Sequence, residues 1–301
     1  MVSFIDCHLS LRRCSPFNGG KFEGWGTSFC WWPNRIGYLD ELSEQAAKLC
    51  FDPKEGLGLN IIRYNIGGGD DPTHHHITRT DSMVPGYAIN PSHDANGYHW
   101  SYDWNADQNQ RNVLMKVAEC YGKDLIVEGF SNSPPYFMTN SGCSSGSVNA
   151  GENNLCEDAY GAFASYLADV AQHFSKEWGI HFQSMTAMNE PDTEYWHALR
   201  DKQEGCHFDP GESQSVMIIA LREALDERGL NDILISGTDE TGIDCQINSI
   251  NSLSEVARET IARIDTHSYL EGDNEGLRKL AQSYYKNLRM SEVDGGDPSG
   301  F

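Results

Sequence analysis

The stretch MTAMNEPDTE, residues 185–194, places an amide and a carboxylate side by side, Asn189 and Glu190, with Pro191 directly behind them. The apolar run before this pair, residues 182–188, predicts a short buried strand. A strand that ends in Asn-Glu-Pro can simply continue into a turn. It can also carry two chemically active side chains to the edge of a sheet, and the rest of the chain decides between these interpretations.

Runs of this kind alternate with longer amphipathic stretches along nearly the whole chain. Seven strands are predicted, at residues 22–29, 60–66, 124–130, 182–188, 233–237, 261–266 and 288–293. Helices are predicted at residues 38–49, 108–120, 159–178, 211–228, 253–260 and 275–286. Asp209 is the expected N-cap of the fourth of these helices. Repeated strand–helix units indicate a parallel sheet covered by helices.

The ends of the predicted strands favour a closed barrel over a doubly wound sheet. Almost every strand ends in polar side chains, among them Asn65, Asn132, Glu190, Glu240 and His267. This is typical of a (β/α)₈ TIM barrel, an α/β fold whose active site lies at the carboxyl ends of its strands. A dinucleotide-binding fold would carry G-x-G-x-x-G after its first strand. Here three glycines follow the second strand instead and continue into two aspartates that would repel a phosphate.

Charge and hydropathy exclude several classes of partner. The 301 residues carry a formal net charge of −22, with 44 acidic and 22 basic side chains. This charge repels phosphate backbones and anionic lipids, so we expect no nucleic acid and no membrane as a partner. No run approaches the ~20 apolar residues of a membrane span. No signal peptide is visible, which is compatible with a cytoplasmic protein or with a secreted one whose signal was removed.

The nine cysteines are scattered and include no C-x-x-C pair. We expect most of them to be free core residues. A disulfide between Cys143 and Cys156, which bracket a loop rich in Gly, Ser and Asn, is the alternative. The histidines at 74–76 lie in a predicted loop, where neighbouring side chains do not share one face, and no metal site is expected there.

Two glutamates end predicted strands that would face each other across a barrel. Glu190 ends the fourth strand and Glu292 the seventh. Glycoside hydrolysis uses two such carboxylates, one protonated to assist the leaving oxygen and the other ionised to attack or to activate water. The alternative is that each is a salt-bridged or solvated carboxylate at a strand end. Their occurrence on opposed strands, one of them after an asparagine, favours catalysis.

Several motifs resemble glycoside hydrolase family 30, a family of clan A retaining glycosidases, in its β-1,6-galactanase branch. These motifs are GWGTSFCWWPNRIG (24–37), GFSNSPPYFMTN (129–140), AMNEP (187–191), HSYL (267–270) and RMSEVDGG (289–296). They occur in the family's order over nearly the full chain. The resemblance implies a retaining O-glycosyl hydrolase that cleaves β-1,6-linked galactan or galacto-oligosaccharides by double displacement, as a monomer and without a cofactor.

The resemblance also implies roles for individual residues. Glu190 is expected to be the general acid/base and Glu292 the nucleophile. Asn189 is expected to bind the sugar 2-hydroxyl, and Arg63 to keep the nucleophile ionised, because a nearby cation lowers a carboxylate pKa. His267 and Tyr269, in the sixth strand, are expected to support the nucleophile and line the reacting subsite.

Further substrate contacts are predicted around these groups. Trp25 ends the first strand, and Trp32 or its neighbour Trp31 follows in the next loop, where an indole face can stack on a sugar ring. Glu240 is a candidate subsite residue or a solvated carboxylate. Asn132 stands where glucosylceramidase-type members carry tryptophan, and we hypothesise that it favours galactose over glucose. Unchanged galactoside and glucoside rates in Asn132→Trp would contradict that hypothesis.

The ends of the chain set the expected domain organisation. An eighth strand and helix would need about 30 residues more than follow the seventh strand. We therefore expect residues 19–301 to be a catalytic barrel lacking its last βα unit, and residues 1–18 to hold one strand of the side β-sandwich that family 30 barrels carry. The alternative functions are another family 30 specificity, such as β-glucosidase, β-xylanase or fucosidase, and an inactive carbohydrate-binding fragment.

Overall fold

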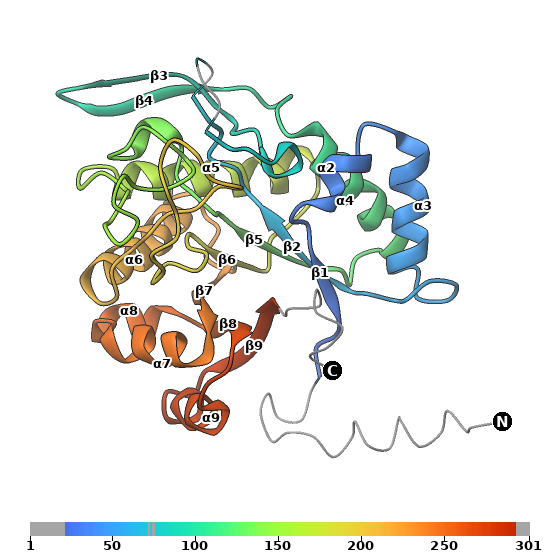
Figure 1. Ribbon diagram of the computed structural model, residues 1–301. Coiled ribbons are helices and arrows are strands. Elements are labelled where there is room, and N and C mark those ends of the chain that lie inside the picture. Colours follow the sequence, from blue (N-terminus) through green and yellow to red (C-terminus); the bar gives the residue numbers. More distant parts are fainter. Residues whose placement is uncertain (1–21, 72, 74–75, 293–301) are drawn as a thin grey trace.

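A computed structural model describes residues 22–71, 73 and 76–292, and its centre is a nearly closed barrel of parallel strands (Figure 1). Each strand pairs in parallel with the next one in the sheet order. That order is β1 (Gly26–Ser28), β2 (Ile61–Asn65), β5 (Ile126–Phe130), β6 (Ser184–Thr186), β7 (Leu234–Gly242), β8 (Arg263–Leu270) and β9 (Asn287–Glu292). The predicted α/β barrel and its seven strands are confirmed. An eighth parallel strand is not among the described residues.

Helices cover the outside of this sheet (Figure 1). They are α2 (Trp32–Ile36), α3 (Asp40–Phe51), α4 (Gln108–Tyr121), α5 (Tyr160–Glu177), α6 (Glu212–Glu227), α7 (Ile243–Ser252), α8 (Glu255–Thr260) and α9 (Asn274–Ser283), with short 3₁₀ turns at Thr80–Ser82 and Tyr136–Met138. In α5, Phe163, Leu167, Val170 and Phe174 recur at helical spacing and are fully buried. Apolar periodicity therefore accounts for the helices that the sequence predicted.

Helix α2 was not predicted, and three further features differ from the prediction. An antiparallel hairpin, β3 (Ala88–Asp94) and β4 (Gly97–Tyr102), extends from the barrel. It was not predicted because its strands are largely exposed and contain a proline, so they lack the apolar alternation that indicates a strand. Helix α7 was missed because its buried face includes the polar Gln246 and Ser249. Helix α6 begins at Glu212 with Gly211 as N-cap. Asp209 is not the cap, because its carboxylate instead accepts a hydrogen bond from Asn153 at 2.6 Å.

Charged side chains fill part of the barrel interior on the side of β8 and β9. Buried Glu128 of β5 contacts Arg263 of β8 and, at 3.1 Å, Arg289 of β9. Arg263 also pairs with Asp265 at 2.5 Å, and Arg289 reaches Glu23, ahead of β1, at 2.6 Å. Buried charges are tolerated where each has an opposite partner. These ion pairs therefore connect β9 to the segment before β1, where the barrel is not closed by strand pairing.

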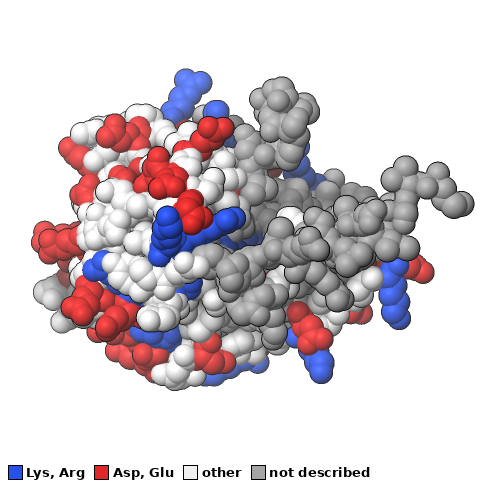
Figure 2. Space-filling model, turned by 90° about the horizontal axis from the view of Figure 1, so that it is seen from below, with Lys and Arg blue, Asp and Glu red and all other residues white. Residues whose placement is uncertain are grey.

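The remaining features of the prediction concern the termini and the cysteines. The strand expected within residues 1–18 lies outside the described residues. All described cysteines are free thiols, including Cys143 and Cys156, so the alternative of a disulfide between them is wrong. None of the described helices has the length and apolar character needed to span a bilayer. Acidic and basic side chains are interspersed on the face seen in Figure 2.

Candidate active site

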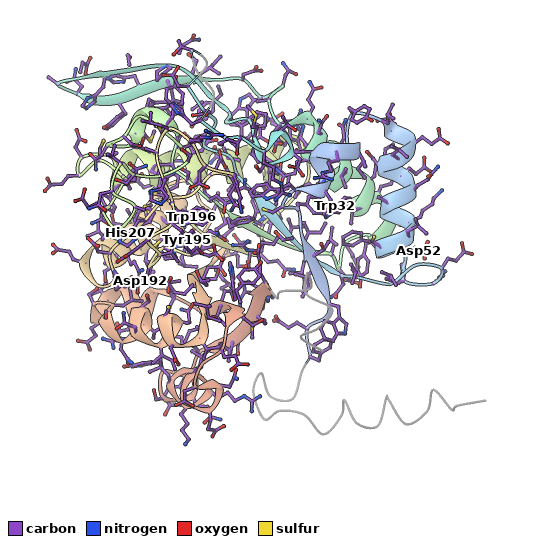
Figure 3. All side chains as sticks on the ribbon, viewed as in Figure 1. Trp32, Asp52, Asp192, Tyr195, Trp196 and His207 are labelled. Atoms are coloured by element: carbon purple, nitrogen blue, oxygen red, sulfur yellow. The ribbon has the colours of Figure 1, made fainter. Side chains whose placement is uncertain are left out.

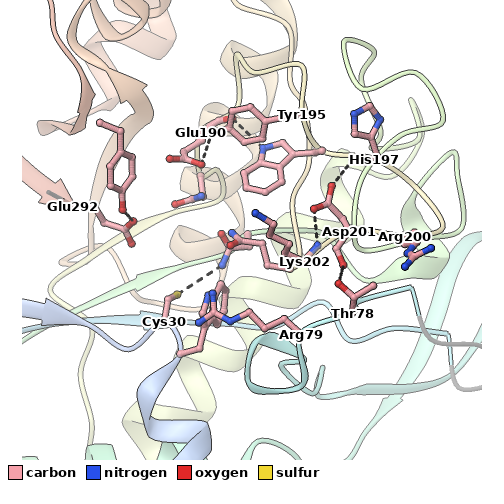
Figure 4. A pocket seen from close by; sticks show the side chains of 16 residues that line it. Cys30, Thr78, Arg79, Glu190, Tyr195, His197, Arg200, Asp201, Lys202 and Glu292 are labelled. Carbon is pink, nitrogen blue, oxygen red and sulfur yellow. Dashed lines mark hydrogen bonds between the residues drawn. The ribbon is translucent and has the colours of Figure 1, made fainter. Parts of the chain in front are cut away.

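A pocket of about 820 Å³ contains both glutamates and three further residues that the sequence singled out. Among its lining side chains are Asn132, Asn189, Glu190, Tyr269 and Glu292 (Figure 4). Asn189 and Glu190 follow β6, Glu292 is the last residue of β9, and Asn132 follows β5. The parallel strands thus bring side chains far apart in the sequence to one end of the barrel, as expected for this architecture.

Arg63, in β2, is buried beneath the pocket and connects its polar groups. Its guanidinium donates to Glu292 Oε1 at 2.5 Å and to Asn189 Oδ1 at 2.7 Å. It also contacts Asp239 and lies 3.4 Å from the centre of the Phe130 ring. Because the Asn189 oxygen is occupied by Arg63, the amide Nδ2 is left to meet a ligand in the pocket.

Glu292 is surrounded by groups that favour its ionised form. Burial raises the pKa of its carboxyl, but the Arg63 and His267 cations and a hydrogen bond from Tyr269 lower it more, so the pKa lies below its usual value. The Tyr269 hydroxyl donates to Glu292 Oε2 at 2.8 Å. A carboxylate held ionised and open to a pocket is suited to nucleophilic attack.

Among the described residues no guanidinium contacts Glu190, whose carboxylate is held by a tyrosine hydroxyl and a histidine. Its Oε2 accepts a hydrogen bond from the Tyr195 hydroxyl at 2.7 Å, and its Oε1 lies 3.0 Å from His267 Nδ1. The backbone at Glu190 is left-handed, with φ 49°, and its N–H donates to the Asp239 carbonyl at 2.8 Å. The two carboxylates of the pocket therefore occupy different environments, which is how a proton donor and a nucleophile are distinguished.

His267 lies between the two glutamates. Its Nδ1 is 3.0 Å from Glu190 Oε1 and 3.9 Å from Glu292 Oε2. Those two oxygens can therefore be no more than 6.9 Å apart, the sum of the two distances. Retaining glycosidases hold their carboxyl groups ~5–5.5 Å apart and inverting enzymes about 6.5–9.5 Å. This upper limit on the oxygen–oxygen distance agrees with the separation in retaining enzymes and overlaps only the lower end of the range for inverting enzymes.

Asp239, in β7, completes the network from below. It is fully buried and contacts Arg63 and Ser291, and its Oδ1 lies 3.3 Å from His267 Nε2. Burial raises the pKa of Asp239, but the two cations hold it well below its usual value. Burial lowers the pKa of His267, yet the carboxylates around it, Asp239 first, raise it to about 10. We call Arg63, Glu190, Asp239, His267 and Glu292 the carboxylate cluster.

His267, which was expected to line the reacting subsite, is fully buried and does not line the pocket, and three other predicted contact residues also lie outside it. Trp25 is 66% exposed and packs edge to face on Phe22. Trp32 packs on Phe29 and donates to the Ser28 carbonyl, away from Tyr195 and Trp196 (Figure 3). Glu240 is fully buried.

The contacts of Glu240 explain its position. Its carboxylate accepts hydrogen bonds from Ser249 at 2.6 Å, Gln214 at 3.0 Å and the backbone of Asp192 at 3.0 Å. These bonds join β7 to α6 and α7, so the position of Glu240 does not support a sugar contact.

Other lining residues come from loops whose pattern carried little signal. Trp31, rather than Trp32, lines the pocket. Tyr195 and Trp196 follow Glu190 in the loop after β6, and the Trp196 Nε1 donates to the Glu190 carbonyl at 3.3 Å. Nearness in sequence to Glu190 is the one feature that could have pointed to Tyr195. Within the described residues, no group of three or more His, Cys, Asp or Glu is arranged to hold a metal ion.

Comparison with known proteins gives a family match over most of this structure. The family described as O-Glycosyl hydrolase family 30 matches residues 22–254. An endo-beta-1,6-galactanase of Hypocrea rufa is 36% identical over 94% of this chain and 60% of its own length. An exo-beta-1,6-galactobiohydrolase of Bifidobacterium longum subsp. longum is 27% identical over 95% of this chain and 24% of its own length. The chain thus spans less than two thirds of either curated relative.

A solved structure supports the fold independently. The catalytic domain of a xylanase C of the same family from Talaromyces cellulolyticus superposes with a TM-score of 0.64. The match has 21% sequence identity and covers 82% of this chain and 53% of the other. At this identity the likeness concerns the barrel and its strand order.

Proposed function

Since the chain belongs to glycoside hydrolase family 30, we propose that it is a retaining glycosidase that cleaves β-1,6-linked galactan or galacto-oligosaccharides. The observation that carries this proposal is the unlike environment of Glu190 and Glu292 around His267. The substrate follows from the two curated relatives, whose names share the β-1,6-linked galactose unit.

Glu292 is the proposed nucleophile and Glu190 the proton carrier. In the first half-reaction, a Glu292 oxygen attacks the anomeric carbon while the glycosidic C–O bond breaks and Glu190 gives its proton to the leaving oxygen. In the second, Glu190 takes a proton from water, the water oxygen attacks the anomeric carbon, and the bond to Glu292 breaks. Two displacements at the same carbon return the original β configuration.

The other groups orient the sugar and the carboxylates. Asn189 Nδ2 is positioned to donate to the 2-hydroxyl of the reacting sugar, because Arg63 already occupies its oxygen. Tyr269 holds one Glu292 oxygen and Arg63 the other, so the nucleophile is fixed before substrate arrives. Asn132 and Trp31 are proposed to contact the sugar ring from the side of β1 and β5.

The test is hydrolysis of a β-1,6-galacto-oligosaccharide followed by proton NMR. We expect a β-configured first product. Glu190→Gln and Glu292→Gln are each expected to lower kcat by at least about a thousandfold. Glu194→Gln, an exposed glutamate outside the pocket in the same loop as Glu190, is the matched control and should retain the parent rate. An α-configured first product, or full activity in either active-site variant, would overturn the proposal.

A further inference from the structure

A buried carboxylate close to the pocket takes no part in the proposed mechanism. Glu204, in the loop after β6, is fully buried and follows Gln203, which lines the pocket, without lining it itself. Taking a carboxylate out of water is costly unless hydrogen bonds replace the lost solvation. The surroundings of Glu204 must therefore supply those bonds.

Three N–H groups from the end of β2 and the loop after it surround Glu204. The backbone N–H groups of Gly68 and Gly69 donate to its Oε1 at 3.0 and 3.1 Å. The Asn65 side chain donates through Nδ2 to its Oε2 at 3.3 Å. A set of three donors suits the ionised carboxylate, which can only accept hydrogen bonds. The loop after β6 is thus fastened to the carboxyl end of β2.

The carboxylate of Glu204 determines which way the Asn65 amide points. Asn65, the last residue of β2, is fully buried, and its side chain has one donor end and one acceptor end. Because an ionised Glu204 can only accept, the Nδ2 end of Asn65 must face it, and the Oδ1 end then points elsewhere. That oxygen accepts the backbone N–H of Asn132 at 3.3 Å. Asn65 therefore connects Glu204 to the segment after β5.

Asn132 lines the pocket, so its position bears on the sugar. Its side chain makes a weak hydrogen bond to the Cys30 Sγ at 3.9 Å, which leaves the amide able to bind a hydroxyl group. The backbone next to it is closely packed, since a Cβ on Gly68 would lie 2.4 Å from the Pro134 carbonyl oxygen. While its N–H is bound to Asn65, the backbone of Asn132 can shift little. Its amide is therefore presented to the pocket in one position.

We propose that Glu204 is a positioning residue for sugar discrimination, acting through Asn65 on Asn132. This inference rests on the proposed function and names the residues that make the site prefer galactose. Galactose and glucose differ in the orientation of one hydroxyl group, at C4. An Asn132 amide held in one position distinguishes the two orientations, and a displaced amide does not. Glu204 does not line the pocket, so its effect on the sugar is indirect.

The protonation state of Glu204 decides the orientation of Asn65. Burial raises the pKa of the Glu204 carboxyl to about 8, although its three hydrogen bonds lower it. The carboxylate of Asp70 raises this pKa further, and the hydroxyl of Tyr166 is a second titratable neighbour. A protonated Glu204 carries a donor, so the Asn65 amide must turn its oxygen toward it and its Nδ2 toward the Asn132 N–H. The bond to Asn132 is then lost below about pH 8 and present above it.

The first measurement uses the unmodified chain. We expect the ratio of kcat/KM for an activated aryl β-galactoside to that for the matching β-glucoside to rise by about tenfold between about pH 6.5 and about pH 9.5. Titrations that act on both substrates, such as those of Glu190 and Glu292, cancel in this ratio. A ratio that does not change with pH would overturn the inference.

Two variants test the connection through Asn65. Glu204→Gln keeps an acceptor for the two glycine N–H groups but places an NH₂ group against Asn65 Nδ2, so the ratio at about pH 9.5 should fall by about tenfold. Adding Asn65→Asp moves the charge to the other side of the same hydrogen bond. The introduced glutamine then donates to the introduced aspartate, which still accepts the Asn132 N–H. This double variant should regain the parent ratio at the same pH.

A substitution in the core is the matched control for loss of stability. Ile250→Val removes one methylene-sized group from a fully buried side chain of α7, outside the pocket, and lowers the free energy of unfolding. Its galactoside-to-glucoside ratio should equal that of the parent. A ratio that is unchanged in Glu204→Gln, or that stays low in the double variant, would contradict the role of Glu204.

A binding measurement separates this inference from the proposed function. Titration calorimetry compares the affinities of the galacto- and gluco-configured epimers of one iminosugar, without turnover. An affinity ratio that falls in Glu204→Gln and returns in the double variant supports the positioning role even if no galactan is cleaved, in which case the proposed function alone fails. Cleavage of β-1,6-galactotetraose with the same affinity ratio in all variants contradicts the positioning role alone.

Discussion

The carboxylate cluster and the basic side chains of the lining loops, Arg79, Arg200 and Lys202, share one pocket but are built in opposite ways. The carboxylate cluster lies at strand ends, is largely buried, and gives each charge an opposite partner within about 4 Å. The basic side chains lie on loops and are exposed, and neither Arg200 nor Lys202 forms an ion pair with a described residue. Rigid, paired charges suit a transition state that must be met without rearrangement. Unpaired charges on a loop suit recognition, where the ligand supplies the missing partner.

The largest expected effect separates the two glutamates of the cluster. Glu292→Ala and Glu190→Ala are each expected to lose more than about a thousandfold in kcat. With an activated aryl β-galactoside, azide should restore turnover in both, giving an α-galactosyl azide from Glu292→Ala and a β-galactosyl azide from Glu190→Ala. NMR of the azide product distinguishes them, and the reverse pattern would exchange the two roles.

Asp239→Asn tests whether the pairing within the cluster matters. We expect kcat to fall by about a hundredfold, because Arg63 and His267 lose the group that orients them. Removing one partner of buried ion pairs is also expected to cost about 3–5 kcal/mol in the free energy of unfolding.

The pH dependence of stability gives the same variant a second readout. The pKa of His267 is about 10 in the folded protein, above its ordinary value of 6.5. The stabilisation from protonated His267 is therefore fully present below pH 6.5 and is lost as the pH rises through 10. In Asp239→Asn this loss should occur at lower pH in thermal unfolding curves. Asp232→Asn, which removes the partner of exposed His181 at 3.0 Å, is the control, and parallel curves for all three proteins would contradict the prediction.

Tyr195→Phe tests a loop residue whose hydroxyl contacts the carboxylate cluster. The change removes the hydroxyl that donates to Glu190 Oε2 at 2.7 Å and keeps the ring. In the proposed mechanism Glu190 becomes charged as it gives up its proton. A hydrogen bond to a charged group contributes about 1.5–3 kcal/mol, so kcat should fall roughly tenfold or more while the melting temperature changes little. Tyr285→Phe, on a side chain that is 96% exposed, should match the parent. An unchanged kcat in Tyr195→Phe would place the hydroxyl outside the reaction.

The smallest expected effect is that of Trp25→Ala. Its indole is exposed and lies outside the pocket, so kcat/KM should stay within about twofold of the parent, as for most surface substitutions. Trp31→Ala, in contrast, removes a lining side chain and should raise KM for the oligosaccharide. Kinetics on β-1,6-galactotetraose check both, and a larger loss from Trp25 than from Trp31 would contradict the placement of the pocket.

Strand periodicity located the two glutamates because strands obey a simple rule. Asn189, Glu190 and Glu292 follow apolar runs, and parallel strands in a barrel must bring such ends together. The loops obey no such rule. Tyr195 and Arg79 reach the pocket through turns that their own sequence does not define, which is why neither was predicted.

Asp239 and Glu240 show a finer limit of sequence reasoning. Both end a predicted strand, and alternation alone cannot say which one faces the barrel axis. In the structure Asp239 has φ 66°, and the pairing of β7 with β8 is irregular at this point. That irregularity directs Asp239 to Arg63 and leaves Glu240 with Ser249 and Gln214. A backbone irregularity of this kind leaves no trace in apolar periodicity.

The place of His267 between the two glutamates has a consequence for the whole catalytic cycle. In the proposed mechanism, Glu292 carries a negative charge and Glu190 a proton before attack; once the glycosyl ester has formed, Glu292 is neutral and Glu190 is the anion. The negative charge thus crosses from one side of His267 to the other, and His267 Nδ1 lies within 3.9 Å of both positions. The net charge of the buried site therefore stays constant through both half-reactions, because the same cation, His267, lies next to each anion in turn.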